Sequence, residues 1–175
     1  MTSARRRRSS PAPSVEIRIE SALWKSVPSA RRALRHAMAA VPQAANTEVA
    51  VLLTDDRFIR ALNRQWRGYD QATNVLSFPA PSSCRSQSAS KTRVNALYGA
   101  PIPLGDIVIA YETTAREASA EGKPILHHLS HLAVHGFLHL LGYDHESHDE
   151  AETMEGLERT VLARLGIPDP YAARA

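Results

Sequence analysis

The sequence has only one cysteine, Cys84, among its 175 residues. A disulfide within the chain is therefore excluded. The sequence also lacks an apolar run long enough to cross a bilayer. The basic N-terminal stretch is followed by "VEIRIE", whose charged residues exclude the apolar segment of a secretory signal. No internal repeat is present, which excludes a solenoid. We expect a single domain that works in the cytoplasm and does not contact a membrane.

Acidic residues are missing from the first 14 positions, which hold four arginines, Arg5 to Arg8. The rest of the chain carries 17 basic and 18 acidic side chains, so the net charge of +3 comes from this stretch. Its composition predicts a disordered extension over residues 1–14, ahead of one catalytic domain over residues 15–175. Within that domain, residues 57–93 hold seven Lys or Arg and one acid, Asp70. Such a basic region indicates an anionic partner, although ordinary solvated faces can have the same composition.

Apolar patterns along the domain predict a mixture of strands and helices. Alternating or β-branched stretches predict strands over residues 15–20, 47–54, 74–79 and 105–110. Apolar residues at helical spacing predict helices over residues 29–40, 55–67, 111–122, 125–141 and 147–166. Residues 80–103, rich in Ser, Pro and Gly, are expected to form a long, flexible loop. The fold class is therefore α+β, with a small mixed sheet and helices packed on it.

The helix predicted over residues 125–141 is apolar around most of its circumference, so we expect it to run, buried, through the centre of the domain. The stretch "HGFLHLLGYDH" begins on it. His135 and His139 share one helix face, and His145 can turn back after Gly142, which is expected to cap the helix. Three imidazoles leave a fourth tetrahedral position open, as in catalytic zinc sites. The spacing predicts one Zn²⁺ per chain, held by these three histidines.

Crowding is the alternative explanation, because the same helix also carries His127, His128 and His131. A pair of histidines four residues apart would then arise by chance. The third histidine beyond the glycine cap favours a metal site, because a buried apolar helix has no other use for so many imidazoles. We expect His131 and Asp144 to support the ligand residues, although Asp144 also suits the turn of "GYDH".

Zinc peptidases with the HExxHxxGxxH frame have a glutamate general base after the first histidine, and this chain has Gly136 there. Zinc lowers the pKa of a bound water from ~16 to about 7, so a nucleophile can form without that carboxylate. Glycine inside a helix costs roughly 1 kcal/mol relative to alanine. Its presence indicates that space is needed beside the ligand, for a bulky phosphodiester or for a neighbouring element of the fold.

The helix predicted over residues 55–67 carries a stripe of four arginines: Arg57, Arg60, Arg64 and Arg67. Such a stripe is most often a solvated face. Here it leads into "RGYDQATNVLSFP", in which Asn74 and Ser77 supply hydrogen-bonding groups. One guanidinium group can donate hydrogen bonds to two phosphate oxygens at once, and its charge stabilises the negative charge that develops on them. We predict that Arg67 has this catalytic role, and that the other arginines, Asn74 and Ser77 contact the substrate.

Three stretches together resemble the YbeY family of bacterial, metal-dependent, single-strand-specific endoribonucleases: "HGFLHLLGYDH", "LNRQWRGYDQATNVLSFP" and "LGDIVIA". The resemblance implies a zincin-like fold, zinc ligands at His135, His139 and His145, and an important arginine at Arg67. It also implies a role in maturing the 3′ end of 16S ribosomal RNA and in ribosome quality control. The partners would then be precursor ribosomal RNA, the small ribosomal subunit and its assembly factors.

Two other functions compete with an RNA hydrolase. A metallopeptidase is favoured by the spacing of the histidines and opposed by Gly136. A ribosome assembly factor without catalytic activity would use the metal only to stabilise its fold. Assays of RNA cleavage, protein cleavage and ribosome association distinguish the three.

Overall fold

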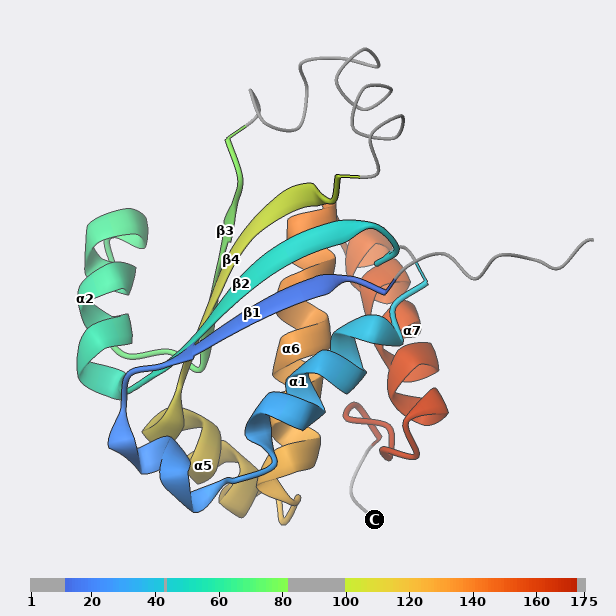
Figure 1. Ribbon diagram of the computed structural model, residues 1–175. Helices are drawn as coiled ribbons and strands as arrows, with labels where there is room; N and C mark the ends of the chain where they lie inside the picture. Colours follow the sequence, from blue (N-terminus) through green and yellow to red (C-terminus); the bar gives the residue numbers. More distant parts are fainter. Residues whose placement is uncertain (1–11, 43, 82–99, 173–175) are drawn as a thin grey trace, which may run out of the picture.

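The computed structural model describes residues 12–42, 44–81 and 100–172, which form a four-stranded sheet with helices on both faces (Figure 1). The strands lie in the order β1 (Ser14–Ile19), β2 (Thr47–Thr54), β4 (Ile102–Ala110), β3 (Val75–Pro79). The first three are parallel and β3 runs antiparallel to β4. The predicted α+β class with a mixed sheet is confirmed.

The main core lies between one face of the sheet and three helices (Figure 1). These helices are α1 (Ala30–Ala39), α6 (Ile125–Leu141) and α7 (His148–Arg164), and a short 3₁₀ helix (Ala22–Ser26) precedes α1. Alternate residues of β2 and β4, such as Val51, Leu53 and Ile107, point into this core. α6 has ten buried residues and ends at Gly142, whose left-handed φ of 98° suits a glycine cap. The expected central, buried helix is confirmed.

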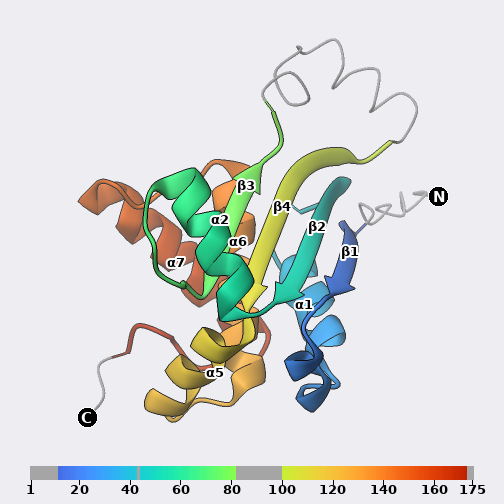
Figure 2. The same ribbon diagram turned by 90° about the vertical axis from the view of Figure 1, so that its left-hand side faces the viewer.

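Among the residues that the structure describes, α2 (Asp56–Arg67) is the helix that covers the opposite face of the sheet (Figure 2). The Asp55 side chain begins this helix by accepting a hydrogen bond from the Phe58 amide at 2.9 Å. α2 buries Ile59 in a small second core with Leu76, Val108 and Ala110. The helix α5 (Tyr111–Ala120) follows β4 and links the two layers. This arrangement brings the C-terminal end of α2 close to β3, beside α6.

The elements begin and end within two residues of the prediction, except at the start of β4. β1 begins at Ser14, and β4 begins at Ile102, inside the expected loop of residues 80–103. The prediction started β4 at Gly105, because prolines and a glycine interrupt the β pattern before it. Gly105 has a φ of +131°, and a Cβ there would lie 2.1 Å from the carbonyl oxygen of Phe78, so only glycine lets β3 approach this closely. Residues 1–11 and 82–99, where most of the predicted extension and loop fall, lie outside the described residues.

Candidate metal centre

Three histidines come together at the end of α6. His135 and His139 lie one turn apart, with their Nε2 atoms separated by 3.1 Å. His145 follows the turn after Gly142, and its ring centroid lies 5.6 Å from that of His135 and 5.0 Å from that of His139. One nitrogen from each ring lies within 4.8 Å of the other two. Three nitrogens this close can share one ion, as the spacing in the sequence predicts.

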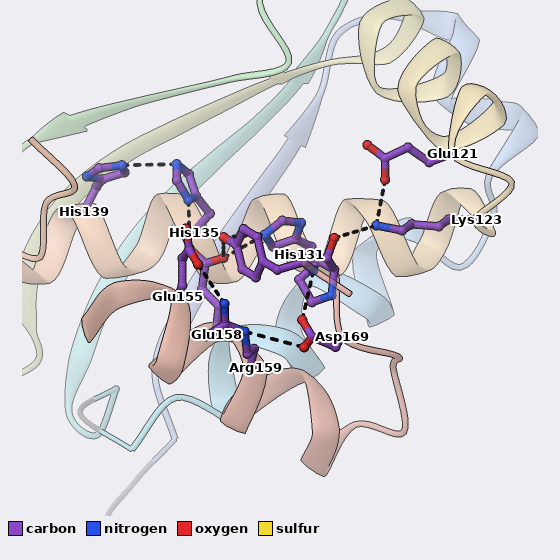
Figure 3. Close-up of polar contacts among 11 residues, drawn as sticks. Glu121, Lys123, His131, His135, His139, Glu155, Glu158, Arg159 and Asp169 are labelled. Atoms are coloured by element: carbon purple, nitrogen blue, oxygen red, sulfur yellow. Dashed lines mark hydrogen bonds and ion pairs between the residues drawn. The ribbon is translucent and has the colours of Figure 1, made fainter. Parts of the chain in front are cut away.

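Hydrogen bonds on the far side of the rings set which nitrogen faces the centre (Figure 3). His139 Nδ1 lies 3.0 Å from the Tyr143 carbonyl oxygen, and His135 Nδ1 lies 2.8 Å from Glu158 Oε1. Carbonyl and carboxylate oxygens only accept, so both Nδ1 atoms carry the proton. The two Nε2 lone pairs then face each other at 3.1 Å. This arrangement is unfavourable unless a cation lies between them, so it fits a metal ion.

The electrostatics keep His139 in the form that can bind a metal. Burial, followed by the nearby His135 and His145 rings, lowers the pKa of His139. A lower pKa leaves the imidazole neutral at neutral pH, and only a neutral imidazole has a lone pair for an ion. The site therefore does not have to release a proton from His139 when a metal binds.

Glu158 of α7 is a central residue of the site that sequence reasoning missed. Its side chain is 1% exposed and accepts hydrogen bonds from His135 Nδ1, from His131 Nε2 at 2.7 Å, and from the Tyr171 hydroxyl (Figure 3). Burial raises the pKa of this carboxyl, but the three hydrogen bonds outweigh burial and lower the pKa to about 2. Glu158 is therefore a carboxylate that orients His135, one of the three histidines that could hold a metal ion.

The signal for Glu158 in the sequence was its position on an apolar stripe. Met154 lies four residues before it and Val161 three residues after it, and both are buried. A charged residue on such a stripe must have buried partners, because an unpaired buried carboxylate is too costly. The other acidic residues between positions 144 and 158 are solvated, so the composition of this stretch gave no reason to single out Glu158.

The two predicted supporting residues lie in different surroundings. His131 bonds to Glu158, so the carboxylate links it to His135. Asp144 is exposed, and its Oδ1 accepts a hydrogen bond from the His145 amide at 2.8 Å. The same oxygen lies 4.0 Å from His139 Nδ1, which already donates to the Tyr143 carbonyl. The contacts of Asp144 are those of a turn residue.

A cleft of about 810 Å³ opens beside the three histidines, and its other wall is β3 with the end of α2. Arg67, Asn74 and Ser77 line this cleft, as does Asp144. The other three predicted arginines do not line it: Arg57, Arg60 and Arg64. Arg60 instead makes two hydrogen bonds of 2.9 Å to the Asp70 carboxylate. The structure thus brings only one end of the arginine stripe to the metal centre.

The polar side chains of Asn74, just before β3, and of Ser77, within it, have partners inside the protein. Asn74 Nδ2 donates to Glu117 Oε2 at 2.9 Å, and its Oδ1 accepts from the Val75 amide at 2.7 Å. Ser77 Oγ donates to the main-chain carbonyl of Gly136 at 3.1 Å. These bonds fix β3 against α5 and α6, so both residues shape the wall of the cleft.

Gly136 of α6 faces the sheet, and side chains of β3 and β4 fill the space beside it. A Cβ at this position would lie 3.0 Å from Ser77 Oγ and 3.2 Å from Ile107 Cγ2. Of the two explanations for this glycine, close packing of β3 and β4 is the one that the structure supports. A glutamate side chain has no room there, so a peptidase-like base cannot occupy this position.

Alanine substitutions at two helix glycines are expected to have opposite effects on stability. Gly156→Ala in α7 should raise the free energy of unfolding by up to about 1 kcal/mol, because nothing lies within 4 Å of its Cβ position. Gly136→Ala should lower it by about 1 kcal/mol, because crowding of the buried Ile107 outweighs the gain in helix propensity. Urea unfolding of both variants checks this, and stabilisation by Gly136→Ala would contradict it.

Comparisons with known proteins show the family. The family model described as "Endoribonuclease YbeY" matches residues 16–166. A protein of that name from Rhodopseudomonas palustris (strain BisB5) is 52% identical over 169 residues, covering 94% of this chain and 84% of the relative. Another, from Bradyrhizobium sp. (strain BTAi1), is 52% identical over 172 residues, covering 94% and 96%. No helix among the residues described is long and apolar enough to span a membrane.

A solved structure gives a more distant match. The solution structure of TM1509 from Thermotoga maritima is 22% identical in sequence and has a TM-score of 0.49, covering 91% of this chain and 99% of that one. The assignment of the family depends on the sequence relatives and on the family model, which spans the sheet, the cleft and the three histidines. This chain belongs to the YbeY family of endoribonucleases.

Proposed function

We propose that this protein is a zinc-dependent endoribonuclease that cuts single-stranded RNA at the cleft beside His135, His139 and His145. The observation that carries the proposal is the pair of Nε2 lone pairs that face each other at 3.1 Å, in a cleft that also contains Arg67. Family membership supports RNA as the substrate. We also propose the finer role that the resemblance implied: maturation of the 3′ end of 16S ribosomal RNA and ribosome quality control in the cytoplasm, with the small subunit and its assembly factors as partners.

The residues of the site have separate tasks in this proposal. The three histidines hold one zinc ion, with His135 and His139 oriented by Glu158 and the Tyr143 carbonyl. When bound, zinc supplies the acidity that makes water a nucleophile near neutral pH. Arg67, on the opposite wall, binds the scissile phosphate and stabilises the negative charge that develops on its oxygens. A metallopeptidase is disfavoured, because Ser77 and Ile107 fill the space that a base after His135 would need.

Replacing Arg67 with alanine is expected to lower RNA cleavage about 30-fold and to leave zinc content unchanged. The loss falls below the range of roughly 10²–10³ for a fully enclosed donor, because Arg67 is exposed to solvent. The measurements are kcat/KM on an unstructured RNA and metal analysis of the same preparation. Arg64→Ala is the matched control, since it removes the same charge one turn earlier on α2, outside the cleft.

Two outcomes would contradict the proposal. Cleavage by the wild type that survives a chelator, and that is equally strong in Arg67→Ala, would mean that neither a metal nor this cleft is needed. Equal losses of activity in Arg67→Ala and Arg64→Ala would mean that the arginines act through net charge alone, without a specific phosphate contact at Arg67.

A further inference from the structure

Trp66, in the last turn of α2, is a large aromatic side chain that the fold leaves exposed. Its side chain is 64% exposed, whereas Trp24, the other tryptophan of the chain, is 1% exposed and donates its indole N–H to the Thr54 carbonyl. Burying an indole would stabilise the fold, so packing does not account for the position of Trp66. Exposed aromatic rings beside a cleft are typical of sites that bind flat ligands.

Trp66 lies on the ridge between two hollows. On one side is the cleft with the three histidines and Arg67, and on the other is an apolar groove of about 740 Å³ between α2 and the sheet. Trp66, Phe78 and Pro79 line both of them. Figure 2 looks onto this side, with α2 in front of β3 and β4. A ligand that leaves the metal centre past Arg67 therefore meets the indole ring next.

Phe78 holds the indole ring from one side. The two ring centroids lie 6.0 Å apart, with an angle of 66° between the ring planes. Phe78 belongs to β3 and is half-buried, so it is a firm support. Because this contact is edge-on, it does not form a closed stack, and a flat group can still lie against the indole. A rigid aromatic ring binds such a group with little loss of side-chain entropy.

The charges around the two hollows limit what can bind there. Arg67 follows Trp66 directly and lies on the cleft side. The far end of the groove, at β1, is lined by Glu16 and Glu20, and its one arginine, Arg18, is paired with Glu20 at 2.8 Å. A third carboxylate of the groove, Asp106, lies on β4 opposite Phe78. A phosphate backbone is attracted at the Arg67 end and repelled at the carboxylate end. The ligand is therefore expected to extend only a short way past Trp66.

We propose that Trp66, supported by Phe78, stacks against an unpaired base of the RNA next to the scissile phosphate that Arg67 binds. This inference rests on the proposed function, because it takes RNA as the substrate. Aromatic side chains stack on any base, so the contact is independent of sequence. Bases inside a duplex are already stacked on each other and cannot reach the indole. This stacking platform, formed by Trp66 and its support Phe78, thus gives the enzyme a preference for single strands.

The first test compares aromatic and aliphatic variants. Trp66→Leu should raise KM for an unstructured RNA about tenfold, the loss expected for one stacked base, whereas Trp66→Phe should raise it less than threefold. Tyr69→Leu is the matched control, because Tyr69 is 60% exposed three residues later and lines neither hollow. Equal KM values for Trp66→Leu and Tyr69→Leu would overturn the proposal.

The second test uses tryptophan fluorescence, which separates the platform from the nuclease activity. A 2′-O-methyl oligonucleotide should quench the emission of the wild type and of Tyr69→Leu but not that of Trp66→Phe, since Trp24 is buried. The matching duplex should quench weakly. Quenching that persists in Trp66→Phe would overturn the platform even if the wild type cuts RNA. If the oligonucleotide quenches the wild-type emission but the wild type shows no zinc-dependent cleavage of RNA, stacking on Trp66 stands and the proposed nuclease activity fails.

Discussion

Replacing His139 with alanine is expected to lower zinc affinity on the order of 10³-fold and to abolish RNA cleavage. Zinc sites in proteins bind with roughly 10–16 kcal/mol, so each of a few ligands contributes about 3–4 kcal/mol. We expect no replacement for this nitrogen from Asp144, whose Oδ1 accepts from the His145 amide and lies 4.0 Å from His139 Nδ1, the nitrogen that bonds to the Tyr143 carbonyl. Isothermal titration with zinc, on protein treated with a chelator, measures the loss directly.

His148→Ala is the matched control for this experiment. His148 is an exposed histidine three residues beyond His145, at the start of α7, and it is not part of the cluster. Zinc should raise the Tm of the wild type and of His148→Ala, because a ligand that binds only the folded state stabilises it. It should leave the Tm of His139→Ala unchanged. An equal rise in Tm for all three proteins would place the metal somewhere else.

The cluster of three histidines could be predicted from the sequence because its geometry is local. A spacing of four on one helix fixes the relation between His135 and His139, and a glycine cap with a short turn limits where His145 can go. None of these relations depends on how distant segments pack. The start of β4 at Ile102 was harder to predict, because its first residues belong to the strand only through their pairing with Thr47 and Glu48 of β2.

The rest of the site depends on contacts between distant segments. The arginine stripe was predicted as a unit, but only its C-terminal end, at Arg67, reaches the cleft. Glu158 lies 23 residues from His135, and Tyr171 a further 13 residues along the chain. Only the packing of α7 and the C-terminal segment against α6 brings them together. Periodicity predicts which face of a helix is buried, and does not predict which partner a buried charge finds.

Glu158→Ala is expected to lower zinc affinity about 100-fold and the free energy of unfolding by about 3 kcal/mol. The first effect arises because His135 loses the acceptor that fixes its ring and its proton. The second arises because three donors lose their acceptor in a buried place: His131, His135 and Tyr171. Zinc titration and urea unfolding without metal measure the two effects separately. Glu155→Ala, which removes a surface carboxylate one turn earlier on α7, is the matched control.

Glu158→Gln separates the charge of this residue from its hydrogen bonds. Its amide oxygen can still accept from His135, and His131 can change tautomer to accept from the amide nitrogen, so the fold should lose less than about 1 kcal/mol. The negative charge that makes His135 a better ligand is lost, so zinc affinity should fall about tenfold. If Glu158 only stabilised the packing of α7 on α6, the glutamine variant would bind zinc as the wild type does. A tenfold loss in a protein of nearly normal stability would instead place Glu158 in the metal site, as a residue that acts through His135.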